Sequence, residues 1–214
     1  MDERLTEAAL SYVKALFANE YSGHDYFHTL RVYRTAVKLS EAEHADPTVT
    51  SLAAILHDAD DRKLSPETYE TKANAVSFLR AQGADEATIR RIVTILGEVS
   101  FRGTDSVVPS TIEGKCVQDA DRLDAVGAIG IARTFAYGGA HHRVMHDPDI
   151  PPETDMDAAR YYAHEATTVN HFYEKLLLLK DMMNTEAGKR LAENRDRYMR
   201  GFLEEFFAEW EGER

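Results

Sequence analysis

Apolar residues recur at helical spacing along most of the chain, and this period constrains the fold more than any other feature. The clearest stripe lies near the C terminus and contains Leu191, Arg195, Tyr198, Phe202, Phe206 and Trp210, broadened by Met199, Leu203 and Phe207. A stripe of this kind packs into a core or against a second copy of the chain. The sequence therefore predicts an all-α protein, with a homodimer contact on this helix as the alternative use of the stripe.

Local signals give the ends of two further predicted helices. Asp85 is a candidate N-cap, and Gly97 follows a stripe formed by Ile89, Ile92, Val93 and Leu96. Ser65 followed by Pro66 predicts another helix start, because Ser caps well and Pro suits the first helical position. Gly83 is the expected end of that helix.

A third helix is predicted to begin at a capping box formed by Ser110 and Glu113. Residues spaced by three or four positions share one face of a helix. Val117, Asp121 and Asp124 should therefore lie on the same side of this helix, which brings two carboxylates to one face.

Chain length and loop signals bound the domain organisation. The 214 residues are enough for one core, so we expect a single domain over residues 1–214. Its core should span about residues 20–130 and its C-terminal helical part about residues 155–211. Gly, Pro and polar residues replace the apolar period at 97–109 and 138–152, which makes these stretches candidate active-site loops.

Composition excludes several classes of function. The 25 basic and 37 acidic residues give a formal charge of −12, so binding to a nucleic-acid polymer is disfavoured while a single nucleotide is not. Cys116 is the only cysteine, which excludes an internal disulfide framework. The N terminus is charged, and no run approaches the roughly 20 apolar residues of a membrane span. We expect a soluble, cytoplasmic protein that does not bind membranes.

Four residues form a candidate metal site: His28, the adjacent pair His57 and Asp58, and the distant Asp121. Two imidazoles and two carboxylates suit a borderline divalent ion such as Mn²⁺, Fe²⁺, Co²⁺, Ni²⁺ or Zn²⁺ better than an oxygen-only Mg²⁺ cage. Neighbouring helical side chains diverge by about 100°, so the ion must sit between two faces, in a cleft between helices. A metal would also offset the cost of a carboxylate among apolar residues.

This ordered set resembles the signature of the HD-domain phosphohydrolases, which is His, then His-Asp, then a distant Asp. The resemblance extends over several motifs: GHDYFH at 23–28, LHDA at 56–59, QDADRLDA at 118–125, ARTFAYGG at 132–139 and NHFYEKL at 170–176. They are similar to one bacterial subgroup, which includes nucleotide pyrophosphohydrolases. The resemblance covers about residue 20 to the C terminus and implies an HD-domain helical bundle.

The histidine positions favour one metal ion within this family. The nine histidines are at 24, 28, 44, 57, 141, 142, 146, 164 and 171, so none lies between Asp58 and Asp121. Relatives with two or more metals resemble one another in carrying extra His ligands in that interval. We therefore expect one divalent ion, with Mn²⁺ favoured and Mg²⁺, Ni²⁺, Fe²⁺, Co²⁺ and Zn²⁺ as alternatives.

The resemblance also suggests catalytic roles. Asp61 follows Asp58 by three residues and would share its side of a continuing helix, where relatives carry an acidic residue that activates water. We assign Asp61 as the candidate general base. Lys63 and Arg122 are adjacent to proposed site residues and are candidates to neutralise charge on the transferred phosphoryl group.

Four residues are candidates for substrate binding. His24 lies one helical turn before His28, within reach of a phosphate. Arg133 and Lys175 could neutralise phosphate charge, and Tyr137 could stack on a base. For each of these the simpler alternative is an ordinary packing or surface role.

The other polar residues near the motifs are not expected to bind metal or substrate directly. Asp124 should support the site by orienting a ligand histidine. Asp60 and Asp119 are expected to face solvent. His141 and His142 receive no metal role.

The candidate metal site and the family resemblance together predict a hydrolase that uses metal-activated water. The resemblance to the bacterial subgroup implies that a nucleoside or deoxynucleoside triphosphate is converted to monophosphate and pyrophosphate. A phosphomonoesterase, a triphosphohydrolase and a nucleotide-binding regulatory module are the alternatives, since the ligand spacing is the same for all of them.

Overall fold

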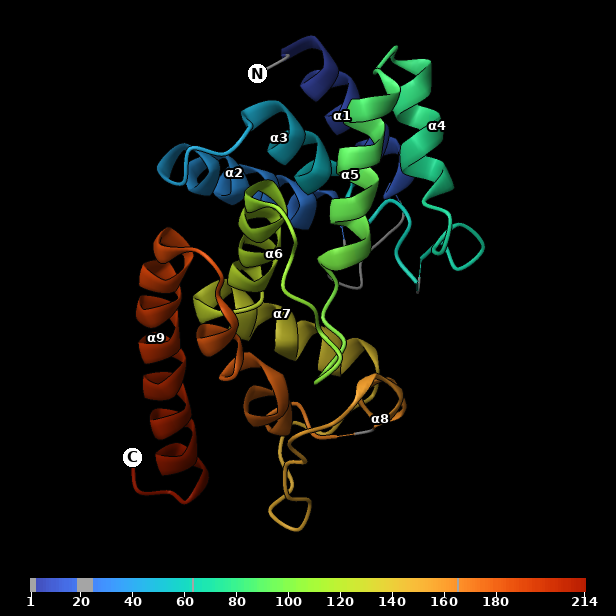
Figure 1. Cartoon of the computed structure of the whole chain (residues 1–214). Coiled ribbons are helices and arrows are strands. Elements are labelled where there is room, and N and C mark those ends of the chain that lie inside the picture. The colour runs from blue at the N-terminus through green and yellow to red at the C-terminus, as the bar shows by residue number, and fades with distance from the viewer. Residues whose placement is uncertain (1–2, 19–24, 63, 165) are drawn as a thin grey trace. The chain divides into compact units, whose positions relative to one another are not determined.

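The computed structural model of the chain describes residues 3–18, 25–62, 64–164 and 166–214 (Figure 1). Within these ranges every regular element is a helix, which confirms the all-α prediction. The elements are α1 (Glu3–Leu16), α2 (Tyr26–Ala42), α3 (Pro47–Leu56), α4 (Ala73–Ala81), α5 (Glu86–Glu98), α6 (Ile112–Asp124), α7 (Gly127–Ala140), α8 (Ala158–Ala163), the π-helix η1 (Phe172–Leu176), the 3₁₀-helix η2 (Leu179–Met182) and α9 (Glu186–Trp210).

The chain divides into two compact units. The N-terminal unit comprises Met1–Phe101 and Ser106–Asp121, and the C-terminal unit comprises Arg102–Asp105 and Arg122–Arg214. The sequence of α6 therefore contributes to both. The single-domain organisation stays a prediction.

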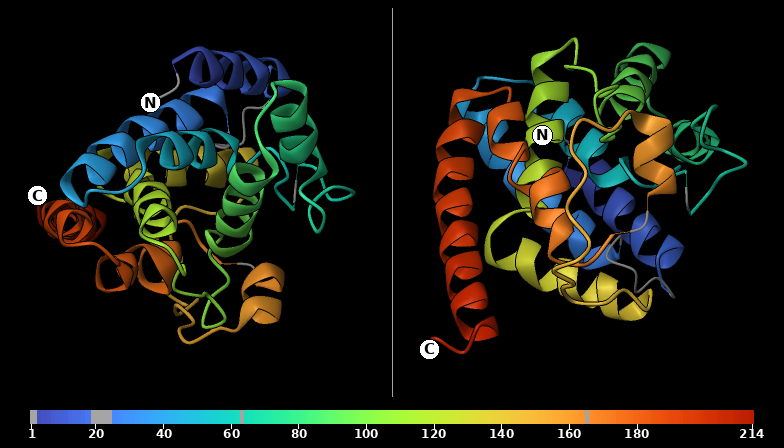
Figure 2. Two further views of the ribbon diagram at one scale, coloured as in Figure 1. Left: turned by 45° about the horizontal axis from the view of Figure 1, so that its top comes forward. Right: turned by 90° about the horizontal axis from the view of Figure 1, so that it is seen from below.

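Helix α3 forms the centre of the N-terminal unit. All eight residues from Val49 to Leu56 are buried, because this helix is apolar on every side and can only be stable when surrounded. It packs against α1, α2 and α5, and the views in Figure 2 show these helices around it. Asp46 caps its N terminus by accepting hydrogen bonds from the amides of Thr48 and Val49.

The predicted cap of α5 is confirmed, and the predicted start of α4 is wrong. Asp85 accepts hydrogen bonds from the amides of Ala87 and Thr88, and α5 continues one residue past Gly97. Residues 66–72 form turns, so α4 begins at Ala73 and not near Ser65. Gly83 adopts a φ of +80° just after α4, as expected for a helix end.

The cap of α6 is one residue later than predicted. The hydroxyl of Thr111 accepts a hydrogen bond from the amide of Gly114 at 3.1 Å, so Thr111 takes the capping role assigned to Ser110. Glu113 does not complete a capping box in this arrangement. Its carboxylate accepts a hydrogen bond from the amide of Asp46 at 3.1 Å, and this long-range contact replaces the local one.

Helices α7 and α9 pack together in the C-terminal unit. The ring of Phe202 on α9 lies 5.8 Å from Phe135 on α7 and 5.9 Å from Phe172 on η1, measured between centroids. The most buried face of α9 contains Ala192, Asp196, Met199 and Leu203. Leu191, Tyr198 and Trp210 are exposed, because they lie beside this face and not on it, so the predicted stripe is only partly correct.

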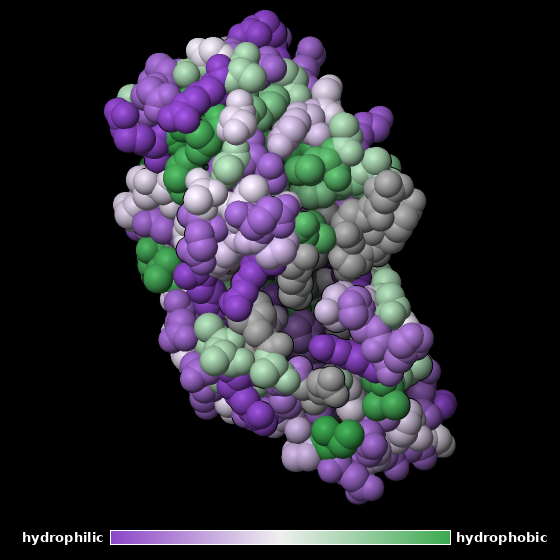
Figure 3. Space-filling model, turned by 90° about the vertical axis from the view of Figure 1, so that its right-hand side faces the viewer, coloured by the Kyte–Doolittle hydropathy of each residue, from purple (hydrophilic) through white to green (hydrophobic). Residues whose placement is uncertain are grey.

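The surface mixes polar and apolar residues. On the face drawn in Figure 3, hydrophilic side chains are interspersed with small, separate hydrophobic patches. Among the residues that the structure describes, no helix combines the length and apolar character needed to cross a bilayer.

Candidate metal centre

His57 and Asp58 lie just beyond the end of α3. The helix ends at Leu56, His57 occupies the C-cap position, and residues 57–60 form a turn. The Nδ1–H of His57 is 2.8 Å from the carbonyl oxygen of Ala54, to which it can donate a hydrogen bond. This bond fixes the tautomer in which Nε2 carries a lone pair, the form that a metal ligand requires.

His28 is held at the start of α2. The amide of His28 donates to the carboxylate of Asp25, the N-cap of this helix, at 2.7 Å. The imidazole is 1% exposed and meets the His57 ring edge-on, with 5.2 Å between centroids. A helix cap and a buried ring contact together fix the direction of its Nε2 atom.

The structure brings all four predicted ligands together within the N-terminal unit. The Nε2 atoms of His28 and His57 are 3.2 Å apart. Asp58 Oδ2 lies 3.4 Å from the first and 3.2 Å from the second. Asp121 Oδ1, from α6, lies 3.5 Å and 3.8 Å from the same two atoms.

These separations fit a divalent cation. Ligand atoms bound at about 2.1 Å lie roughly 3.0 to 3.4 Å apart around an octahedral or tetrahedral ion, close to the separations seen here. The side chains of His28, His57 and Asp58 are 1%, 3% and 10% exposed, whereas that of Asp121 is 29% exposed. The site is therefore enclosed on the histidine side and accessible beside Asp121, as a catalytic metal site must be.

The electrostatics of the centre favour a cation. Burial lowers the pKa of His57, but the charge of Asp58 and its hydrogen bond, together with the charge of Asp121 and the Ala54 carbonyl, raise that pKa to about 10. The negative potential that stabilises a proton on His57 also attracts a divalent ion.

Asp61 follows the ligand Asp58 by three residues, but it does not lie in a helix as the sequence predicted. Its amide donates to the carbonyl of Asp58 at 3.1 Å, and its carboxylate accepts from the amide of Leu64 at 3.3 Å. The helical continuation assumed from the sequence is wrong because α3 has already ended. The role of Asp61 as a base stays a prediction, and His24 and Lys63 lie outside the described residues.

Arg122 and Arg133 bind groups inside the C-terminal unit. One guanidinium N–H of Arg122 donates to the carbonyl oxygen of Met182. Arg133 donates to the carboxylate of Asp124 at 2.8 Å and to its carbonyl oxygen at 3.3 Å. These contacts stabilise the end of α6, and the predicted phosphate roles stay untested.

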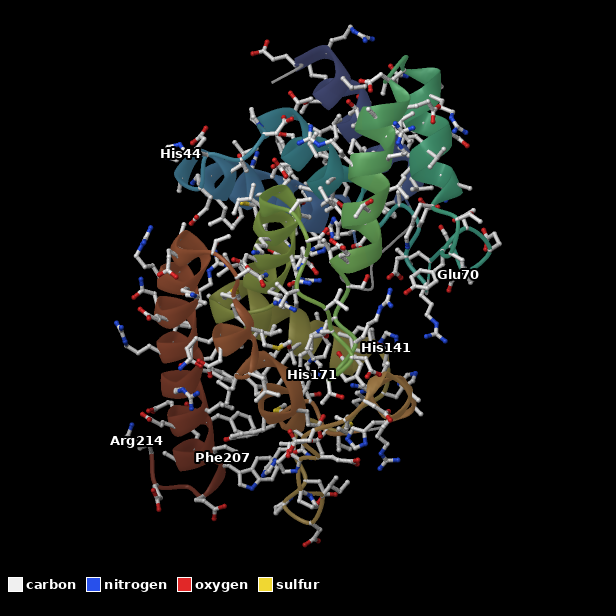
Figure 4. All side chains as sticks on the ribbon, in the orientation of Figure 1. His44, Glu70, His141, His171, Phe207 and Arg214 are labelled. Atoms are coloured by element: carbon white, nitrogen blue, oxygen red, sulfur yellow. The ribbon has the colours of Figure 1, made fainter. Side chains whose placement is uncertain are left out.

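Tyr137 and Lys175 also belong to the C-terminal unit. The Tyr137 ring stacks on His141, with 3.8 Å between centroids and 18° between planes. Figure 4 labels His141, which caps the C terminus of α7. Lys175 Nζ lies 5.7 Å from the centre of the Tyr161 ring. Their roles in substrate binding stay predictions.

Two expectations about carboxylates are wrong. Asp60 is 1% exposed and Asp119 is fully buried, so neither faces solvent. Asp60 accepts hydrogen bonds from the amides of Asn74 and Ala75, both at 3.0 Å. Burial is tolerated because these donors replace water.

Sequence reasoning missed a glutamine that fixes the helix bearing Asp121. Gln118 is completely buried, and its amide group donates to the carbonyls of Glu98 at 2.9 Å and Val107 at 3.0 Å. The available sequence signal was the position of Gln118, a polar residue one helical turn before the ligand Asp121. Its partners lie 20 and 11 residues away, so the sequence pattern could not identify them.

Comparison with known proteins identifies the family of the chain, and the roles of the four ligands stay predictions. The model of the HD domain family matches residues 25–126, a segment that includes all four. The protein YpgQ of Bacillus subtilis (strain 168) is 38% identical over 200 residues, which cover 92% of this chain and 89% of YpgQ.

Solved structures share the fold over nearly the whole chain. A protein from Lactobacillus plantarum is 36% identical, with a TM-score of 0.87 and 97% of each chain covered. An HD-superfamily hydrolase from Bacillus thuringiensis is 40% identical, with a TM-score of 0.75 and coverage of 99% and 100%. YpgQ in complex with ADP has a TM-score of 0.76 at 32% identity, covering 97% of this chain and 98% of YpgQ. With these relatives and this arrangement of histidines and aspartates, the chain belongs to the HD-domain phosphohydrolase family.

Proposed function

We propose that the protein hydrolyses nucleoside or deoxynucleoside triphosphates to monophosphate and pyrophosphate, with one divalent ion bound by His28, His57, Asp58 and Asp121. The observation that carries this proposal is the convergence of four donor atoms from α2, the turn after α3 and α6, each within 3.8 Å of at least one histidine Nε2. Two nitrogen and two oxygen donors suit a borderline divalent ion, and among these ions we propose Mn²⁺, with the others as alternatives.

A nucleotide substrate is supported by a relative. YpgQ, which is 38% identical to this chain, has been solved in complex with ADP. A nucleoside diphosphate presents the same sugar, base and phosphoanhydride chemistry as a triphosphate. We therefore place nucleotides ahead of other phosphate compounds as substrates.

The proposed reaction assigns a task to each part of the site. A bound divalent ion lowers the pKa of water and polarises a phosphoryl oxygen. The hydrogen bond from His57 to the Ala54 carbonyl keeps Nε2 directed at the centre. The accessible side of the site, beside Asp121, is where substrate would enter.

Asp61 would accept the proton of the attacking water at a carboxylate oxygen. Water attacks the α-phosphorus, the bond from that atom to the α–β bridging oxygen breaks, and pyrophosphate leaves. Lys63 and Arg122 are the candidates to stabilise the negative charge that develops on the phosphate oxygens.

Product analysis tests this function. Protein reconstituted with Mn²⁺ is incubated with nucleoside triphosphates, monophosphates and cyclic nucleotides, beside His57→Ala and Asp58→Ala. We expect monophosphate and pyrophosphate in equal amounts from wild type and neither product from the variants. Nucleoside with inorganic triphosphate would identify a triphosphohydrolase, and nucleoside with inorganic phosphate from a monophosphate would identify a phosphomonoesterase. Nucleotide binding without turnover would identify a regulatory module. Repeating the assay with Mg²⁺, Ni²⁺, Fe²⁺, Co²⁺ and Zn²⁺ tests the choice of metal.

A further inference from the structure

The turn that carries His57 and Asp58 depends on tertiary contacts for its shape. It lies outside α3, and its backbone hydrogen bonds include those from the Ala59 amide to the Leu56 carbonyl and from the Asp61 amide to the Asp58 carbonyl, at 3.0 and 3.1 Å. Short-range bonds of this kind leave a turn adjustable unless other groups hold it. The positions of two metal ligands therefore depend on what binds residues 59 and 60.

Asp60 is bound by the N terminus of α4. The residue at the N-cap position, Lys72, has a left-handed backbone with φ of +52° and makes no side-chain capping bond. The amides of Asn74 and Ala75, the second and third residues of α4, donate instead to the two carboxylate oxygens of Asp60, both at 3.0 Å. The carboxylate of Asp60, which lies in a distant turn, therefore caps α4. The positive end of the helix dipole also stabilises its negative charge.

The side chain of Asn74, on α4, also binds the turn directly. Its amide nitrogen donates to the carbonyl oxygen of Ala59 at 2.9 Å and to the hydroxyl of Thr68 at 3.1 Å. Ala59 is completely buried, so its carbonyl has no water to replace a lost donor. Turn 57–60 and α4 therefore hold each other through three hydrogen bonds, two to Asp60 and one to Ala59.

We propose that Asn74 is a positioning residue for the metal centre, an inference that rests on the metal site of the proposed function. The Ala59 carbonyl is one residue from Asp58, so displacement of this carbonyl moves both ligands of the turn away from His28 and Asp121. Metal–ligand distances must be correct within about 0.2 Å. Asn74 contributes no ligand atom, and its effect on the metal is exerted through the backbone of the turn.

Direct metal binding tests this inference. We expect Asn74→Ala to bind Mn²⁺ about tenfold more weakly than wild type by isothermal titration calorimetry. The absorption spectrum of the Co²⁺-loaded variant should also change, because the spectrum reports the coordination geometry. A loss of stability alone would change neither the Mn²⁺ affinity nor the Co²⁺ spectrum of the folded protein.

Phe78→Leu is the matched control on the same helix. Phe78 is 8% exposed and stacks on Tyr12, with 4.7 Å between centroids, so its loss destabilises α4 packing without removing a bond to the turn. The control should bind Mn²⁺ with wild-type affinity. Equal weakening in Phe78→Leu and Asn74→Ala would overturn the proposal, because it would show an effect of stability and not of position.

A second variant is available if Asn74→Ala does not fold. Asn74→Asp keeps the size of the side chain but replaces the donor to Ala59 with an oxygen, and a carboxylate is tolerated in a first helical turn. It should also bind Mn²⁺ more weakly. Wild-type affinity, within about twofold, in either folded variant would overturn the inference alone. A wild-type protein that binds no Mn²⁺ would overturn the proposed function itself.

Discussion

The two units of the chain use their charged residues differently. In the N-terminal unit, two histidines and two aspartates direct acceptor atoms at one another, and Asp58 and His57 are buried. In the C-terminal unit, Arg133 binds Asp124, and Arg195 donates to the carbonyl of Leu123. Histidine nitrogens and carboxylate oxygens that face one another favour a proton or a cation between them, whereas these two arginines of the C-terminal unit are paired with acceptors. This difference supports the N-terminal unit as the place of the proposed chemistry and indicates a structural network at the end of α6.

Removing a ligand should have the largest effect. We expect Asp58→Ala to weaken Mn²⁺ binding by more than about 100-fold, because it removes a donor from the ion and not merely a supporting group. Calorimetric titration measures the affinity, and circular dichroism checks the fold. His141→Ala, a change of an exposed residue in the C-terminal unit, should bind Mn²⁺ normally. Equal loss in both variants would remove the distinction between the units.

Breaking the arginine network should lower stability without lowering metal affinity. We expect Arg133→Met to reduce the free energy of unfolding by about 2 kcal/mol, since Asp124 is 6% exposed and loses a charged donor. Urea unfolding measures this change. The side chain of Arg133 is 22% exposed, which moderates the effect. A raised KM for nucleotide with unchanged stability would instead support the predicted substrate contact.

Cys116 provides a probe of opening in the N-terminal unit. Burial, together with the negative charges of Asp119, Glu43 and Glu113, raises the pKa of its thiol to about 12. The native thiol should therefore react slowly with iodoacetamide at pH 8, and bound Mn²⁺ should slow the reaction further by stabilising the folded state. Mass spectrometry measures the labelling rate. Rapid labelling that is insensitive to Mn²⁺ would contradict this prediction.

The same shift predicts how stability depends on pH. The folded protein keeps the Cys116 proton up to about pH 12, whereas the unfolded chain loses it near the ordinary thiol pKa of 9. Between these values the folded state binds more protons, so this group's contribution to stability is present below pH 9 and falls as the pH rises. Cys116→Ala should show a shallower loss of stability over this range in urea unfolding.

Exposed ion pairs should have the smallest effect in both units. Arg80 binds Glu86 at 2.8 Å in the N-terminal unit, and Arg160 binds Glu153 at 2.6 Å in the C-terminal unit. Solvent screens these pairs, so Arg80→Ala and Arg160→Ala should leave the melting temperature almost unchanged. Differential scanning calorimetry at low and high salt tests this, and a large salt-independent drop in either variant would contradict it.

Some of the fold could be predicted because its cause is local. Asp85 binds amides two and three residues ahead, and the stripe of α5 follows helical spacing over the same segment. These interactions form within one or two turns of the same helix. The start of α4 could not be predicted in this way. Its cap is Asp60, which lies 14 and 15 residues from its two partners.

The buried face of α9 shows the same limit. A helical period indicates that one side is apolar, and several adjacent faces of this helix carry large apolar residues. Packing against α7 and η2 selected the face of Met199 and Leu203 and left Tyr198 60% exposed. The choice among these faces depends on the shapes of the helices that they meet.

The sequence by itself determined the helical class, the α5 cap and, through its resemblance to a family, the four candidate ligands. Only the tertiary structure decided that His57 and Asp58 lie in a turn beyond α3, that Asp60 is buried, and that Asn74 holds this turn. Periodicity and capping act over a few neighbouring residues. The Asp60–Asn74 link joins residues that approach only when α4 folds back onto the turn, so no local pattern contains it.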